Sequence, residues 1–279
     1  MTETEGVYQF SLGAFRCTVI CDGEETWETV PDEWITFANA SHAEVTEARR
    51  AYTEATGDPS AEVSMNILLI DTGRHLVLVD TGCGPHPANP INGKLLERLG
   101  AIGVATTEID LVINTHGHWD HVEGNTDGHG NPTFPNARYV MSGVEWASRT
   151  ANPTETDKTK LLAIAGRFEQ IAMDAEIVPG IRAIPASGHS SGQIALLIES
   201  DGAGLLHAAD TFHHPIELIH PEWYFAFESD PEATVRTRRQ LCALAAHEHL
   251  LVLPYHLPFP GLGHIAARGD HWIWQRLRQ

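Results

Sequence analysis

The segment 115–121, Thr-His-Gly-His-Trp-Asp-His, places three imidazoles and a carboxylate within six positions: His116, His118, Asp120 and His121. It follows an apolar run, 111–113, of the kind that forms a buried strand. Imidazoles and carboxylates are ligands of zinc, manganese and iron, and such a compact group is costly to keep without a metal. The alternative, a polar histidine-rich loop, is less favoured. The segment therefore predicts a metal site at the end of a strand.

The bulk composition describes an ordinary globular protein. The chain has 279 residues, of which 42% are hydrophobic and 20% charged, long for one domain but within the range of large layered folds. No run of 18 apolar residues occurs, so no membrane partner is expected. The acidic start lacks the cationic and apolar parts of a signal peptide. We therefore expect a cytoplasmic protein.

The charge balance argues against a nucleic-acid partner. The net charge is −19, and the densest basic cluster is Arg236, Arg238 and Arg239, which we expect on a solvated helix face. The four cysteines, Cys17, Cys21, Cys83 and Cys242, show no CxxC spacing. We expect buried, reduced thiols. Cys83 lies near the metal region, but a nucleophilic role is not expected without a paired base.

Strand and helix patterns alternate along the chain. Strands are expected at 7–10, 15–21, 64–71, 75–80, 111–114, 137–141, 180–185, 193–199, 205–208 and, last, 250–253. Helices are expected after the capping box of Ser41 and Glu44 up to Gly57, at 94–100, from Ser142, over 157–171, and from Asp230 to about His249. Strand runs in both halves with helices between them predict an α/β fold, two sheets face to face with helices outside. One domain is expected over 1–279.

Three further ligand candidates each follow an expected strand. They are His189, Asp210 and His256. A lone histidine after a strand is more often a surface or capping residue. Three such residues in series, downstream of the 116–121 segment, favour ligands held at the rigid ends of a sheet.

Together these residues resemble the metallo-β-lactamase superfamily, over nearly everything from Ser64 to His264. The motifs that carry the resemblance are Asp80-Thr81-Gly82, the 116–121 segment, Ser187-Gly188-His189, Asp210 and His256. The chain is most similar to the branch of lactonases and organophosphate hydrolases. The resemblance implies a four-layer αββα sandwich and two divalent metal ions, zinc first, with manganese, cobalt or iron as alternatives. It also implies that His116, His118 and His189 hold metal one, that Asp120, His121 and His256 hold metal two, and that Asp210 bridges both.

The residue spacing is compatible with this ligand set. His116 and His118 lie two apart at a strand end, so their side chains share one face. Asp120 and His121 are adjacent and need a turn to point inward together. Two metals roughly 3.5–4 Å apart can share a hydroxide that attacks a carbonyl or phosphoryl centre. Asp80 is either a partner that orients the histidine loop or a simple strand-end cap.

Two features bear on catalysis and substrate. In related lactonases the equivalent of Asp120 is suggested to protonate the leaving group, and a tyrosine follows the bridging aspartate by three positions. This chain has His213 there, so that residue either donates a hydrogen bond to the substrate or only lines the pocket. Aromatic residues are expected to line the pocket or to fill the core: Trp119, Phe212, Trp34, Phe37, Trp223 and Phe225. By resemblance, 27–62 is a lid or a dimer-contact arm, and a homodimer is expected.

The resulting hypothesis is a dinuclear-metal hydrolase of small apolar lactones or related esters. The alternative is an organophosphate triesterase or arylesterase that uses the same site, and a β-lactamase is less favoured. The charge opposes a nuclease. A redox protein of this superfamily would need an added flavin domain, and a binding module would be expected to have lost ligands.

Overall fold

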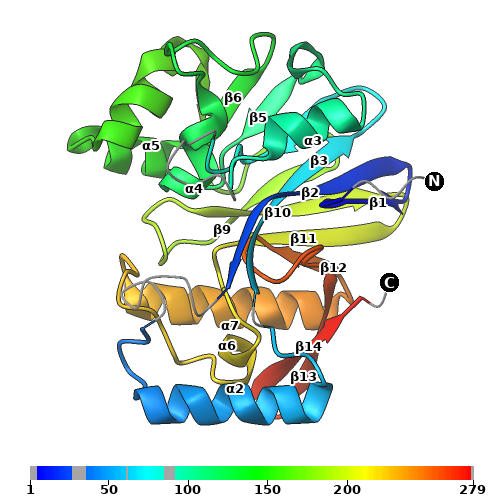
Figure 1. Ribbon diagram of the computed structural model, residues 1–279, viewed down its shortest axis with the longest axis vertical. Helices are drawn as coiled ribbons and strands as arrows, with labels where there is room; N and C mark the ends of the chain where they lie inside the picture. Colours follow the sequence, from blue (N-terminus) through cyan, green and yellow to red (C-terminus); the bar gives the residue numbers. More distant parts are fainter. Residues whose placement is uncertain (1–4, 27–35, 61, 85–91, 278–279) are drawn as a thin grey trace.

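Two sheets packed face to face, with helices on both outer sides, form the body of the protein. The computed structural model describes residues 5–26, 36–60, 62–84 and 92–277. Figure 1 shows α3, α4 and α5 on one side of the strands and α2, α6 and α7 on the other. The predicted four-layer αββα sandwich is confirmed.

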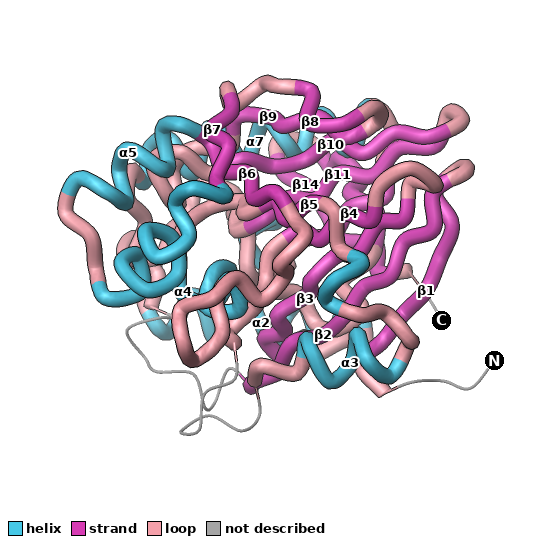
Figure 2. Tube along the Cα trace, turned by 90° about the horizontal axis from the view of Figure 1, so that it is seen from above, coloured by secondary structure: helices cyan, strands magenta, loops and turns pink. Residues whose placement is uncertain are grey.

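The first sheet comes from the N-terminal half of the chain. Its seven strands lie in sequence order: β1 (Val7–Leu12), β2 (Phe15–Thr26), β3 (Glu62–Asp71), β4 (Leu76–Val79), β5 (Leu111–Ile113), β6 (Arg138–Ser142) and β7 (Phe168–Ile171). β1 to β4 pair antiparallel, and β4 to β7 pair parallel. Figure 2 allows the sheet to be followed from β1 at the right to β7 near the top. Because β4, β5 and β6 are parallel, their carboxyl ends meet at one edge.

The second sheet comes from the C-terminal half. Its seven strands are β8 (Glu176–Val178), β9 (Ile181–Pro185), β10 (Ile194–Ser200), β11 (Ala203–Ala209), β12 (Leu251–Pro254), β13 (Gly263–Arg268) and β14 (His271–Arg276). All neighbours pair antiparallel except β11 and β12, which are parallel. The strands β9, β11 and β12 therefore also end at one edge.

The helices begin and end where local capping favours it. They are α2 (His42–Thr56), α3 (Leu95–Ala101), α4 (Trp119–Val122), α5 (Gly143–Ala151), α6 (Ile216–Ile219) and α7 (Pro231–His247). The capping box of Ser41 and Glu44 is present, and Gly57 ends α2 in the left-handed conformation. Ser142 and Asp230 cap α5 and α7 through their side chains. The caps predicted at Ser41, Gly57 and Asp230 are confirmed, and the helix expected from Ser142 begins there.

Two predictions about the elements are wrong. The expected helix at 157–171 is instead a short π-helical stretch (Asp157–Leu161), a 3₁₀ stretch (Leu162–Arg167) and β7. Phe168 packs toward the helical side of the sheet and Ile171 toward the core between the sheets, and a run of four residues does not reveal a strand by periodicity. The expected last strand is also followed by two more, β13 and β14, and β8 was not anticipated.

The core lies between the sheets and is lined by branched aliphatic residues from both. Val19, Leu68, Ile113, Leu196 and Ile198 belong to it and are fully buried. All four cysteines are free and buried, as predicted. Burial raises the pKa of Cys17 to about 12, so this thiol stays protonated. Within the described residues, no helix has the length and hydropathy needed to cross a membrane.

The described part of the 27–62 segment packs on the loop after α6. The N–H of Ala38 donates to the carbonyl of Tyr224 at 2.9 Å, and the N–H of Ala226 donates to the carbonyl of Thr36 at 3.2 Å. α2 then packs beside α6, and both lie with α7 on the outer side of the second sheet (Figure 1). The predicted pocket residue Trp34 lies outside the described residues.

Candidate metal centre

The predicted ligands gather where both sheets present their strand ends. His116 and His118 follow β5, and α4 provides the turn that directs Asp120 and His121 inward. His189 follows β9, Asp210 follows β11, and His256 follows β12. All seven side chains, from segments far apart in sequence, form two adjoining groups.

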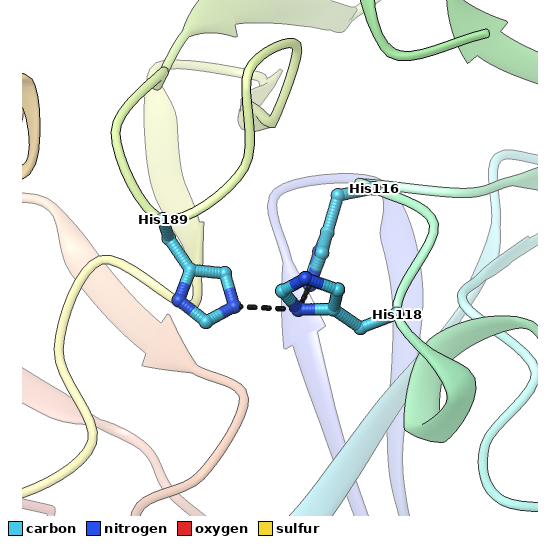
Figure 3. A group of neighbouring side chains, drawn as sticks. All are labelled: His116, His118 and His189. Carbon is cyan, nitrogen blue, oxygen red and sulfur yellow. Dashed lines mark hydrogen bonds between the residues drawn. The ribbon is translucent and has the colours of Figure 1, made fainter. Parts of the chain in front are cut away.

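The first group consists of three imidazoles. The ligand atoms of His116, His118 and His189 lie within 4.8 Å of one another. Nδ1 of His118 is 3.0 Å from Nε2 of His116 and 2.8 Å from Nε2 of His189 (Figure 3). Figure 3 also shows that His189 approaches from a separate loop and points toward the other two rings. Three converging ring nitrogens match the protein ligands of a zinc site with an open position.

The second group combines carboxylates with imidazoles. Nε2 of His256 lies 3.3 Å from Oδ2 of Asp120 and 3.1 Å from Oδ2 of Asp210. Nε2 of His121 lies 3.2 Å from Oδ1 of Asp210. Oδ2 of Asp210 is also 3.3 Å from Nε2 of His189, in the first group. Asp210 therefore stands between the two groups, where one carboxylate can serve both.

The outer ring nitrogens of these histidines have their own partners. Nδ1 of His121 lies 2.9 Å from Oδ2 of Asp80. Nδ1 of His256 lies 3.2 Å from the carbonyl oxygen of Ser64. When an oxygen accepts from the outer nitrogen, the inner nitrogen is left as a free acceptor, which is the tautomer that ligates a metal. The donor set and its orientation thus fit divalent cations.

Asp80 also ties the histidine loop to the end of β4. Its Oδ1 accepts from the N–H of Thr115 and its Oδ2 from the hydroxyl of Thr115, both at 2.8 Å. The side chain is fully buried. The structure therefore places Asp80 as a partner of both the loop backbone and His121, which is more than a strand-end cap provides.

Opposing effects set the pKa values of the histidines in the two groups. Burial is the main cause that lowers the pKa of His118 to about 3, with His189 adding to it. Burial alone would also lower the pKa of His256, but the charge of Asp210 and hydrogen bonds with Asp120 and Asp210 outweigh it and raise it to about 9. His118 is therefore neutral and ready to ligate at pH 7, whereas His256 must lose a proton first.

A buried glutamate that sequence reasoning missed lies beside His189. Oε2 of Glu228 lies 3.3 Å from Nδ1 of His189, and the hydroxyl of Thr234 donates to the same oxygen at 3.0 Å. Glu228 lies in the loop between the aromatic run and α7, and a single glutamate before a helix cap carries no sequence signal. Glu228 therefore puts a carboxylate next to the outer nitrogen of His189, at a longer distance than that between Asp80 and His121.

His213 lies beside both groups. Its Nε2 is 3.6 Å from Oδ2 of Asp210, and its ring stacks on that of His256 with centroids 5.1 Å apart and an interplanar angle of 17°. Only 7% of the residue is exposed. The ring is therefore held next to the ligands, within reach of a group bound there.

The predicted aromatic residues separate into different environments. Phe37, Trp223 and Phe225 form a buried cluster, in which Phe37 stacks on Phe225 at 4.2 Å. Phe225 contacts the ring of His213 edge-on, so this cluster packs against the side chain that lies beside the ligands. Trp119 is partly buried against the first helical layer. Phe212 packs in the core beside Trp274, so its predicted place in the pocket is wrong.

Among the described residues, Phe227 is an aromatic residue that faces solvent beside the ligands. It is 37% exposed, and its ring stacks on Phe225 at 5.1 Å. Its edge contacts are to His189 and His213, with centroids 5.5 and 5.6 Å away. The aromatic run 223–227 did signal a cluster, but sequence alone did not show which ring is open.

Arg238 contradicts the predicted solvated face of α7. It is fully buried and forms an ion pair with Glu217 at 2.5 Å. The other oxygen of Glu217 accepts from the N–H groups of His213 and His214 at 2.6 and 2.9 Å. The pair thus shapes the loop that carries His213, while Arg236 on the same helix is exposed.

Comparison with known proteins agrees with this geometry. The layered fold and its histidine–aspartate centre define a metal-dependent hydrolase. A model of the metallo-beta-lactamase superfamily matches residues 62–275, and the chain belongs to this superfamily.

Three relatives indicate the range of similarity. An N-acyl homoserine lactonase of Bacillus cereus is 26% identical over 156 residues, which cover 50% of this chain and 59% of that protein. The crystal structure of AbOPH, a hydrolase of the beta-lactamase superfamily, has a TM-score of 0.85 at 26% identity and covers 100% of this chain and 99% of that one. AidC, a dizinc quorum-quenching lactonase, has a TM-score of 0.84 at 24% identity over 98% of each chain, which shows a shared fold.

Proposed function

We propose that this protein is a dinuclear-metal hydrolase that opens lactones or cleaves related esters with apolar substituents. The observation that carries the proposal is the position of Asp210, whose carboxylate lies within 3.3 Å of ring nitrogens from both ligand groups. A second support is the similarity to N-acyl homoserine lactonases. Two divalent ions, zinc first, would be held by the seven ligands.

Three residues of the chain would have separate roles around the substrate: proton transfer, hydrogen bonding and apolar contact. When bound, the two ions would supply a hydroxide nucleophile at neutral pH and polarise the electrophilic oxygen. Asp120, whose Oδ2 lies 3.3 Å from Nε2 of His256, would take up the proton of the hydroxide once it has added to the substrate and would pass this proton to the leaving alkoxide. His213 would hold the substrate oxygen by a hydrogen bond, and Phe227 would contact the apolar substituent.

Metal analysis combined with a substrate panel tests the proposal. Protein purified without added metal is analysed for bound zinc, manganese, cobalt and iron, and then assayed on lactones, aryl esters, a phosphotriester and a β-lactam. We expect about two ions per chain and the highest kcat/KM on a lactone. A preference for the phosphotriester would favour the organophosphate-hydrolase alternative instead.

Ligand variants separate metal-dependent turnover from other causes. Asp210→Ala and His118→Ala are expected to lose bound metal and turnover together. Asp270→Asn, whose side chain is fully exposed, is the matched control and should keep both. Turnover by a variant that has lost its metal would refute the proposal.

A further inference from the structure

We propose that Glu145, outside the ligand set, is the positioning residue that sets the metal affinity of the three-histidine group selectively. Its carboxylate joins the loop of His116 and His118 to the loop of His189. This inference rests on the proposed function only in taking these histidines as metal ligands.

One oxygen of Glu145 holds the first ligand loop. Oε1 accepts from the N–H of Gly117 at 3.0 Å, and Gly117 is the residue between His116 and His118. On the same face of α5, one turn further, Arg149 donates to the carbonyl of Gly117. The N–H and the carbonyl of Gly117 are therefore both hydrogen-bonded to side chains of α5. These bonds fix the backbone between His116 and His118, and with it the positions of the two rings.

The other oxygen of Glu145 holds the second ligand loop. Oε2 accepts from the hydroxyl of Ser190, the neighbour of His189, and from the N–H of Gly192 at 2.9 Å. The hydroxyl of Ser142, the N-cap of α5, donates to the carbonyl of Gly192 at 2.6 Å. The loop after β9 is thus fixed to the same helix end as the loop after β5.

Close approach of the backbone shows how tightly these parts fit. A Cβ on Gly192 would lie 2.1 Å from the backbone nitrogen of Glu145, and a Cβ on Gly117 would lie 2.7 Å from the side chain of Arg149. The loop of His189 needs glycine at position 192 because the backbone of α5 lies directly against it, whereas at Gly117 the side chain of Arg149 fills the space. Glu145 itself is fully buried. A buried carboxylate without its donors would be costly, so each of the three bonds contributes to holding the two loops against α5.

The arrangement predicts an effect on one ligand group only. The bonds of Glu145 go to the loops of the three-histidine group. The outer nitrogens of His121 and His256 are held instead by Asp80 and the carbonyl of Ser64. Loss of a partner bonded directly to a ligand typically costs about 10–100-fold in metal affinity, and we expect an effect within this range from Glu145 because it holds the neighbours of three ligands.

Glu145→Gln tests this inference with little change in volume. The amide NH₂ would face an N–H or O–H donor of one loop, so that loop would be released. Metal-free protein is titrated with Co²⁺ against a competing chelator, and absorbance reports each equivalent bound. We expect one equivalent to bind about 10–100-fold more weakly and the other to change less than about twofold. The weakened equivalent should be the one that His118→Ala lacks.

Controls distinguish positioning from general destabilisation. Glu169→Gln, an exposed carboxylate on β7, should bind cobalt like the wild type. Ser190→Ala removes one of the three bonds and should give a smaller loss of cobalt affinity at the same equivalent. This variant replaces Glu145→Gln as the test if Glu145→Gln does not fold. Equal weakening of both equivalents, or of neither, would overturn the inference. A wild-type protein that binds no cobalt would instead refute the proposed function.

Discussion

Truncation of Phe227 offers a direct test of how an apolar substituent is recognised. The ring is 37% exposed and is held by stacking on Phe225 beside His189 and His213. A phenylalanine side chain presents about 200 Å², so about 75 Å² of Phe227 is free to be covered by substrate. At about 25 cal/mol per Å², this contact contributes about 1.9 kcal/mol, or about 20-fold in kcat/KM.

The assay is a series of lactones that differ only in acyl-chain length. Phe227→Ala should lower kcat/KM about 20-fold for a long acyl chain and less than about threefold for a chain too short to reach the ring, with metal content unchanged. Leu96→Ala on α3, at 42% exposure, is the control for loss of an exposed apolar side chain. An equal loss across all chain lengths would show that Phe227 supports the site and does not contact the substituent.

Three further perturbations test other parts of the structure. His213→Ala should lower kcat about a hundredfold with metal content unchanged if its ring donates to the substrate oxygen, and a change below about threefold would leave it a lining role. Arg238→Met leaves Glu217 unpaired and should cost about 3–5 kcal/mol in urea unfolding, whereas Arg236→Ala should cost less than about 0.5 kcal/mol. In metal-free protein, the raised pKa of His256, about 9, stabilises the fold fully below its unfolded value near 6.5, and this contribution is lost as pH rises through 9. The urea midpoint should therefore decrease as the pH rises from 6.5 to 9, and this decrease should be smaller in His256→Asn. An equal decrease in the variant would contradict the assignment of the effect to His256.

The parts of the fold that local signals dictate were predictable from the sequence. The capping box at Ser41 and the N-cap at Asp230 bond to backbone groups within a few residues. The residues that form the cap are therefore all visible in a short stretch of sequence. The seven candidate ligands were identifiable because histidines and aspartates that recur at strand ends are energetically unfavourable unless they bind a metal. The structure brings all seven together, although their roles remain proposals.

The parts that depend on distant partners were not predictable. Arg238 looked like a solvated cation because nothing near it in sequence shows that Glu217 lies opposite it. Glu145 and Glu228 act through loops far away in the chain, so their sequence neighbours carry no signal. Phe212 and Phe227 flank the same loop, yet one enters the core and the other remains open, because the path of the chain decides which way each ring faces.

The origin of the ligands from both halves has a consequence for how the protein folds. The hydroxyl of Tyr255, next to His256, donates to the carbonyl of Asp120 at 2.7 Å across 135 residues of chain. Contacts of such separation close late, because the loop entropy must be lost before they form. During synthesis the histidines of the first half emerge long before their partners. If the proposed ions bind as described, the complete ligand set would therefore form only after the two halves of the chain have met.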